Sequence, residues 1–182
     1  MITPVAATSI DLGDEAPVFG DLQGVDGKSH RLSSFDDKPV LVLVFIANGC
    51  PTVRVYDDRL IALQTKYRAA GAQIVAFNSN NPFLSPPDVL PEMVKRAGSA
   101  AYNFPYLKDE DGAVARSYGA MTTPHAFVFD CERRLRYRGR IDDSRDPSKL
   151  TSSDLADAVA AVVEGRTVEV PDTQPFGCAI VR

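Results

Sequence analysis

The chain has 182 residues, 45% of them hydrophobic and 24% charged, a composition typical of a single soluble domain. Its formal net charge of −4 argues against a surface that binds nucleic acid or an anionic membrane, and no apolar run approaches the length of a membrane span. The first residues lack the basic start and apolar run of a secretory signal, so we expect a cytoplasmic protein.

The chain divides into three expected parts. Residues 1–10 show little pattern and are expected to form an N-terminal arm, residues 11–164 the domain, and residues 165–182 a C-terminal tail with no helical period. Complete burial of a large apolar side chain contributes about 1.5–3 kcal/mol, so we expect the tail to dock onto the domain. The apolar side chains of the tail are Val168, Val170, Phe176, Ile180 and Val181.

The first half of the domain predicts a hairpin, a strand, a helix and a second strand. Residues 18–22 lead toward Asp26-Gly27, a pair typical of a hairpin turn. Residues 40–46 are apolar at every position, as in a strand buried on both faces. Residues 51–67 begin with a proline and carry one apolar helical stripe, and residues 73–77 predict another buried strand.

The second half predicts shorter elements. Four prolines between positions 82 and 91 interrupt regular structure. We then expect a helix over residues 88–100, a short strand over 106–108 and a short helix over 111–118. An antiparallel hairpin over 126–138 and a last helix over 152–163, capped by a serine, complete the domain. This order indicates an α/β fold with a central mixed sheet flanked by helices.

Cys50 follows the first long strand and precedes Pro51 at the start of the first helix. Folds of this class bind ligands beyond the carboxyl ends of their strands. Unpaired N–H groups at a helix start stabilise a thiolate and lower a thiol pKa from about 8.5 toward 3.5–7.5. Most free cysteines are small core residues, but this position favours a reactive thiol.

Four features in combination resemble the redoxins, the alkyl hydroperoxide reductase/thiol-specific antioxidant branch of the thioredoxin superfamily. They are Gly13-Asp14-Glu15-Ala16-Pro17-Val18-Phe19, Asp26-Gly27-Lys28, Cys50, and Thr123-Pro124 before the second hairpin. The resemblance implies a thioredoxin-like fold and a peroxiredoxin-like, antioxidant thiol oxidoreductase. Cys50 takes the place of the attacking cysteine and Pro124 that of the cis-proline beside it, and we expect Thr123, Pro124 and Asn48 to contact the substrate.

Two positions depart from the patterns of related families. Thioredoxins have a second cysteine three residues after the first, where this chain has Val53. Peroxiredoxins have a threonine three residues before the peroxidatic cysteine, where this chain has Ala47. We therefore expect no dithiol exchange within one short loop and at most slow peroxidase activity.

The end of the chain, Phe176-Gly177-Cys178, resembles the closing motif of a redoxin-like subgroup with one cysteine at the helix start. Residues 78–81 and 137–143 fit the same subgroup. If the tail docks, Cys178 is a candidate to resolve Cys50 in place of the missing cysteine at position 53. The alternative, that Cys178 is only a packed tail residue, stays open because a disulfide requires Cα atoms within about 7 Å.

Two classes of function stay open. The first is an enzyme that acts on a small-molecule oxidant or a protein thiol or disulfide through Cys50, without cofactor or metal. The second is a module that holds a metal such as Cu(I), or a partner, through Cys50, Cys178 and His125. A lone histidine is more often structural, and Cys131, at the second hairpin turn, is interpreted as incidental. The oligomeric state is left open.

Overall fold

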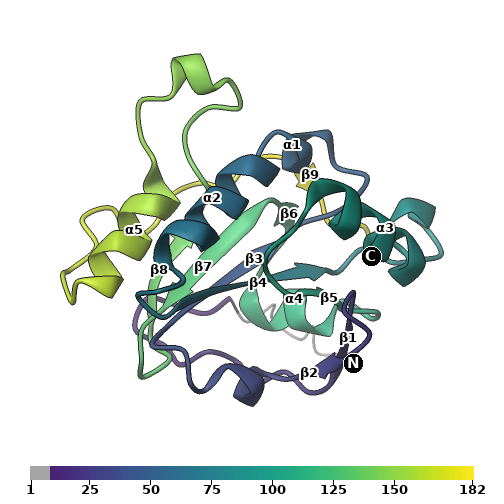
Figure 1. Cartoon of the computed structure of the whole chain (residues 1–182), viewed down its shortest axis with the longest axis horizontal. Helices are drawn as coiled ribbons and strands as arrows, with labels where there is room; N and C mark the ends of the chain where they lie inside the picture. Colours follow the sequence, from purple (N-terminus) through teal and green to yellow (C-terminus); the bar gives the residue numbers. More distant parts are fainter. Residues whose placement is uncertain (1–8) are drawn as a thin grey trace, which may run out of the picture.

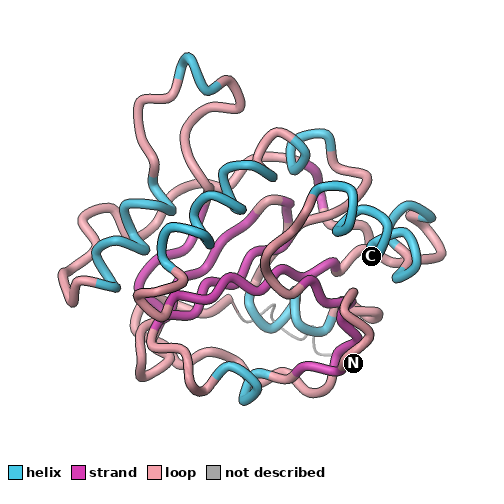
Figure 2. The backbone as a smooth tube through the Cα atoms, in the orientation of Figure 1, coloured by secondary structure: helices cyan, strands magenta, loops and turns pink. Residues whose placement is uncertain are grey.

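The computed structural model describes residues 9–182, so most of the expected N-terminal arm lies outside the described residues. Helices cover both faces of a central sheet (Figure 1, Figure 2). The helices are α1 (Pro51–Arg54), α2 (Asp57–Tyr67), α3 (Leu90–Ala100), α4 (Ala113–Tyr118) and α5 (Asp154–Val163). Among the described residues, no helix is long and apolar enough to cross a membrane.

Seven strands form the central sheet in the order β2-β1-β5-β4-β3-β7-β8. They are β1 (Leu22–Gly24), β2 (Ser29–His30), β3 (Val40–Phe45), β4 (Ala72–Asn78), β5 (Tyr106–Lys108), β7 (His125–Phe129) and β8 (Leu135–Gly139). β3 runs parallel to β4 and antiparallel to β7, and β4 runs parallel to β5. The mixed α/β sheet predicted from the sequence is therefore confirmed, and its arrangement is thioredoxin-like.

The uniform apolar pattern of β3 follows from burial on both faces, because successive side chains of a strand point to opposite sides. Val42 and Val44 belong to the core that α2, α3 and α5 cover. Leu41, Leu43 and Phe45 belong to the core on the other side, which includes α4. β3 is thus packed on both faces of the sheet, and the loop that leads to Cys50 begins at the end of this buried strand.

A second, two-stranded sheet joins the chain end to the domain. β9 (Cys178–Ala179) pairs antiparallel with β6 (Thr122–Thr123), with Thr123 opposite Cys178. The tail, drawn in yellow, crosses the top of the domain toward α1 before it reaches β9 (Figure 1). The tail places its last cysteine beside the loop that follows β3.

Two expected elements differ in the structure. The helix expected over residues 51–67 is divided into α1 and α2, because the N–H of Tyr56 donates to the carbonyl of Val53 and tightens the turn between them. The first hairpin consists of β1 and β2 and not of a strand over residues 18–22; Val18 is exposed, and only Leu22 of that stretch lies in β1.

Candidate active site

Cys50 lies at the junction of the β3 loop and α1, where it is the N-cap residue of α1. Its backbone is extended, and its N–H donates to the carbonyl of Ala47 over 3.3 Å. The side chain is only 2% exposed, and its Sγ lies 3.4 Å from the carbonyl oxygen of Thr123. Cys50 therefore occupies the helix start expected from the sequence, at the carboxyl end of a central strand.

Cys178 forms a disulfide with Cys50, across 128 positions of the sequence. Their Cα atoms are 5.9 Å apart, within the range that a disulfide requires. The tail thus supplies the second sulfur that the first helix lacks, since the side chain at position 53 is a buried valine. Cys131 is exposed and free.

The tail reaches Cys50 along β6. The peptide bond between Thr123 and Pro124 is cis, and both residues are buried. Beyond Cys178, the N–H of Ile180 donates to the carbonyl of Met121 over 2.9 Å. Thr123 and Pro124, which were expected to contact substrate, are therefore covered by the tail in the disulfide-bonded form.

Gly177 is required by this close approach. Its φ is +151°, and a Cβ at this position would overlap the carbonyl oxygen of Thr123. A side chain at position 177 would therefore push the tail away from β6 and from Cys50. This contact is a physical reason for a glycine immediately before Cys178.

Asn48 does not face an open site. The residue is buried, its Nδ2 donates to the carbonyl of Pro87 over 2.7 Å, and its Oδ1 accepts from the hydroxyl of Tyr106 over 3.0 Å. Its backbone N–H donates to Asp88. Both ends of the Asn48 side chain therefore have partners inside the protein, and its contact with substrate stays a prediction.

His125 follows Pro124 in β7 and is buried against Phe127. Burial, reinforced by the nearby charge of Arg138, lowers its pKa to about 4, so the imidazole is neutral at pH 7. Between residues 9 and 182, no group of three or more His, Cys, Asp or Glu side chains is placed to hold a metal ion.

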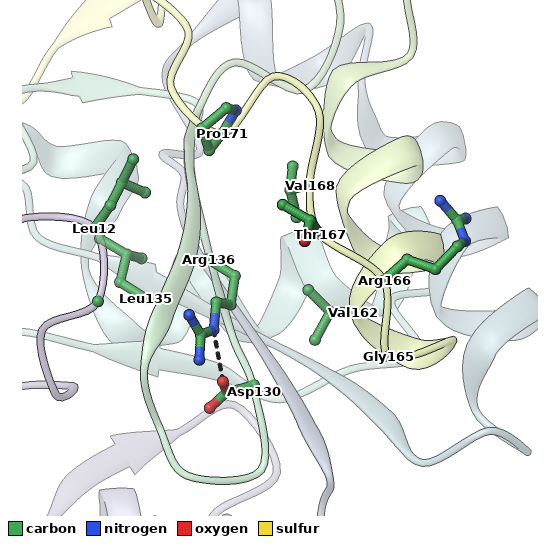
Figure 3. Close-up of a pocket in the computed structure, with 11 residues that line it drawn as sticks. Leu12, Asp130, Leu135, Arg136, Val162, Gly165, Arg166, Thr167, Val168 and Pro171 are labelled. Atoms are coloured by element: carbon green, nitrogen blue, oxygen red, sulfur yellow. Dashed lines mark hydrogen bonds and ion pairs between the residues drawn. The ribbon is translucent and has the colours of Figure 1, made fainter.

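A surface pocket of about 520 Å³ has neither Cys50 nor Cys178 among the residues that line it (Figure 3). It is bounded by the hairpin of β7 and β8, the end of α5 and the start of the tail, with Leu12 on one side and Val168 on the other. Arg136 in this pocket donates to Asp130 over 2.6 Å. Its charged group is thus paired within the protein.

Asp88 is a further functional candidate, which the sequence patterns do not single out. The sequence predicts residue 88 at the start of a helix, and residues 78–81 only fit the pattern of the redoxin-like subgroup. The signal that was available is the run of polar residues directly after a buried strand, at the same sheet edge as Cys50. Asp88 is fully buried, and its partners include Asn48, Asn78 and Asn80.

Comparisons with known proteins agree with this geometry. The profile of the Redoxin family matches residues 11–159. A hypothetical protein from Sinorhizobium meliloti 1021 has a similar structure, with a TM-score of 0.88 and 38% identity over 95% of both chains. The thioredoxin domain of a thiol-disulfide oxidoreductase from Bacteroides vulgatus matches with a TM-score of 0.67 and 19% identity, covering 85% of this chain and 99% of that one. Thiol-disulfide oxidoreductase ResA from Bacillus thuringiensis subsp. konkukian is 25% identical over 126 residues, 69% of this chain and 68% of that protein.

Proposed function

Because the chain belongs to the Redoxin family, we propose that it is a thiol–disulfide oxidoreductase in which Cys50 is the nucleophile and Cys178 the resolving thiol. The observation that carries this proposal is the disulfide between a helix-start cysteine and a tail cysteine. A relative whose name describes a thiol-disulfide oxidoreductase, ResA, supports the same class of reaction. The substrate class is a protein disulfide, or the corresponding dithiol in the reverse direction.

The reaction begins from the reduced protein. The thiolate of Cys50 attacks one sulfur of the substrate disulfide, which forms a mixed disulfide and releases the other substrate sulfur as a thiolate. Cys178 then loses its proton and attacks the sulfur of Cys50, and the second substrate sulfur leaves. The substrate gains two electrons and two protons, and the protein loses them as the Cys50–Cys178 disulfide forms.

Two features of the site suit these steps. Cys50 is the N-cap residue of α1, and we expect the partial positive charge of a helix start to stabilise its thiolate as nucleophile and as leaving group. Backbone hydrogen bonds pair β9 with β6, and we expect this pairing to keep Cys178 close to Cys50 after reduction. This proximity makes resolution fast compared with attack by a second molecule.

The proposal predicts that disulfide exchange is much faster than peroxide reduction. Position 47 is a buried alanine without a hydroxyl to polarise a peroxide, and the carbonyl of Thr123 near the sulfur cannot donate a hydrogen bond. In stopped-flow experiments on the reduced protein, we expect the rate constant with hydrogen peroxide to lie at least about 1,000-fold below the diffusional ceiling of about 10⁸–10⁹ M⁻¹ s⁻¹.

The matched measurement uses the same reduced protein and a disulfide-bonded peptide. We expect Cys50 and Cys178 to oxidise together with this peptide, with two peptide thiols released per protein. A peroxide rate near the ceiling, together with an inert response to the peptide, would assign the protein to the peroxidases instead. Cu(I) bound by both cysteines, without either reaction, would favour the metal-binding alternative.

A further inference from the structure

A single buried carboxylate lies beneath both cysteine-bearing segments. Asp88, at the end of the loop after β4, has no exposed surface. Its Oδ1 accepts from the backbone N–H of Asn48 and from Nδ2 of Asn78, each over 2.7 Å. Its Oδ2 accepts from Nδ2 of Asn80 over 2.8 Å and from the hydroxyl of Ser85 over 2.5 Å. Each oxygen therefore has two donors.

The first oxygen holds the segment that carries Cys50. Asn48 stands two positions before Cys50, and its N–H is the group that Asp88 binds. The side chain of Asn48 is anchored in the same network through Tyr106, whose hydroxyl also accepts from Asn78 over 3.0 Å. This branch fixes the loop between β3 and α1, and with it the direction in which Cys50 presents its sulfur.

The second oxygen holds the segment that carries Cys178. Nδ2 of Asn80 donates to Asp88, which leaves its Oδ1 to accept from the backbone N–H of Val181 over 2.8 Å. The next residue, Asn81, donates its N–H to the carbonyl of Val181 over 2.8 Å. Val181 stands three positions after Cys178, so this branch fixes the tail just beyond the resolving sulfur.

Charge makes the carboxylate suited to this double role. Burial alone would raise the pKa of Asp88, but hydrogen bonds from Asn80, Ser85, Asn78 and Asn48 outweigh burial and hold the pKa below its usual value. The ammonium group of the buried Lys108 donates to the carbonyl of Asn80 over 2.5 Å, so a positive charge supports the same loop. Asp88 is therefore an ionised acceptor with four donors at neutral pH.

We propose that Asp88 is a positioning residue that holds Cys50 and Cys178 in register, one segment on each carboxylate oxygen, and so favours the disulfide over the dithiol. The inference rests on the proposed function, because it concerns the equilibrium between the two sulfurs. It does not require Asp88 to touch either sulfur or the substrate. An asparagine at position 88 has one acceptor oxygen and one NH2 group in place of two acceptor oxygens. It can therefore accept hydrogen bonds from the Cys50 branch or from the tail branch, but not from both.

The test is the thiol–disulfide equilibrium of each variant in glutathione redox buffers, quenched with acid and measured by mass spectrometry. For Asp88→Asn we expect the equilibrium to shift toward the dithiol by about 10-fold or more, because hydrogen bonds to a buried charged group are lost. Asn80→Ala removes the side-chain link from Asp88 to Val181, leaves the Cys50 branch in place, and is expected to shift the equilibrium in the same direction. Asn80→Ala also keeps the proposal testable should Asp88→Asn fail to fold.

The matched control is Asp109→Asn. Asp109 is also a buried carboxylate, and it accepts from Ser79 and from the N–H groups of Val114 and Ala115 at the start of α4. Its side chain makes no hydrogen bond to Asn48, Asn80 or Val181, so its loss is expected to lower stability and leave the thiol–disulfide equilibrium within about 2-fold of wild type. The stability of each variant is measured in parallel by chemical denaturation.

The outcomes separate this inference from the proposed function. If the wild-type protein forms no reversible disulfide in these buffers, the proposed function fails and the role of Asp88 fails with it. If the wild type titrates reversibly but Asp88→Asn and Asn80→Ala match it, Asp88 is only structural and the oxidoreductase proposal stands. An equal shift in Asp109→Asn would show that general destabilisation, not positioning, moves the equilibrium.

Discussion

Replacing Cys50 with serine is expected to lower the rate of exchange with a disulfide-bonded peptide by about 1,000-fold or more, as the loss of an enzyme's nucleophile does. The serine hydroxyl keeps the size of the side chain but cannot form a disulfide. Cys131 lies in the turn after β7, at the other end of this strand from Pro124, so we do not expect it to pair with Cys178 in place of Cys50. The measurement is the release of peptide thiol over time from the reduced variant.

The companion variant is Cys178→Ser, which keeps the nucleophile and removes the resolving thiol. We expect it to react once with the peptide and to stop at a mixed disulfide on Cys50, identified by peptide mapping. Cys131→Ser is the control and should react like wild type. Retention of fast exchange in Cys50→Ser, or a stable adduct on Cys131, would contradict the assignment of Cys50.

Reduction of the Cys50–Cys178 disulfide is expected to lower the free energy of unfolding by about 3–5 kcal/mol. The bond closes a loop of 128 positions, which restricts the unfolded chain far more than it restricts the folded one. The measurement is denaturant unfolding of the wild-type protein with and without a reductant. We expect the protein to stay folded after reduction, because nearly all residues of its two hydrophobic cores are residues other than Cys50 and Cys178.

The control for this prediction is Cys178→Ser, whose stability should not respond to the reductant. Its stability should resemble that of the reduced wild type, apart from the change of one side chain. Equal stability of the oxidised and reduced wild type would mean that the unfolded chain gains little freedom on reduction, contrary to the loop-closure argument.

Much of the fold was predictable because local patterns and burial agree. The unbroken apolar run of β3 reflects its position between two cores, and a glycine follows α4 where its backbone is left-handed. The break between α1 and α2 was not predictable, since the apolar stripe continues through Tyr56. That break depends on how the Tyr56 backbone bonds to Val53 once the ring is buried.

The candidate site was predictable only in part, because some of its contacts join segments that are far apart in the sequence. The position of Cys50 follows from its place between a strand and a proline, and the apolar side chains of the tail predict that it docks onto the domain. The register that sets Cys178 opposite Thr123 depends on contacts between segments more than fifty positions apart. The hydrogen bond from Asn48 to Asp88 spans 40 positions, and no local pattern indicates such a partner.

The most direct test of the central claim is a redox titration of the wild-type protein with peptide mapping of all three cysteines. The protein is equilibrated without oxygen in buffers of graded glutathione ratio, quenched with acid and alkylated. We expect Cys50 and Cys178 to become protected from alkylation together, in one two-electron transition, while Cys131 stays alkylated throughout. Independent titration of Cys50 and Cys178, or a Cys50 that remains a thiol or becomes sulfinic acid while Cys178 stays reduced, would contradict a Cys50–Cys178 redox pair.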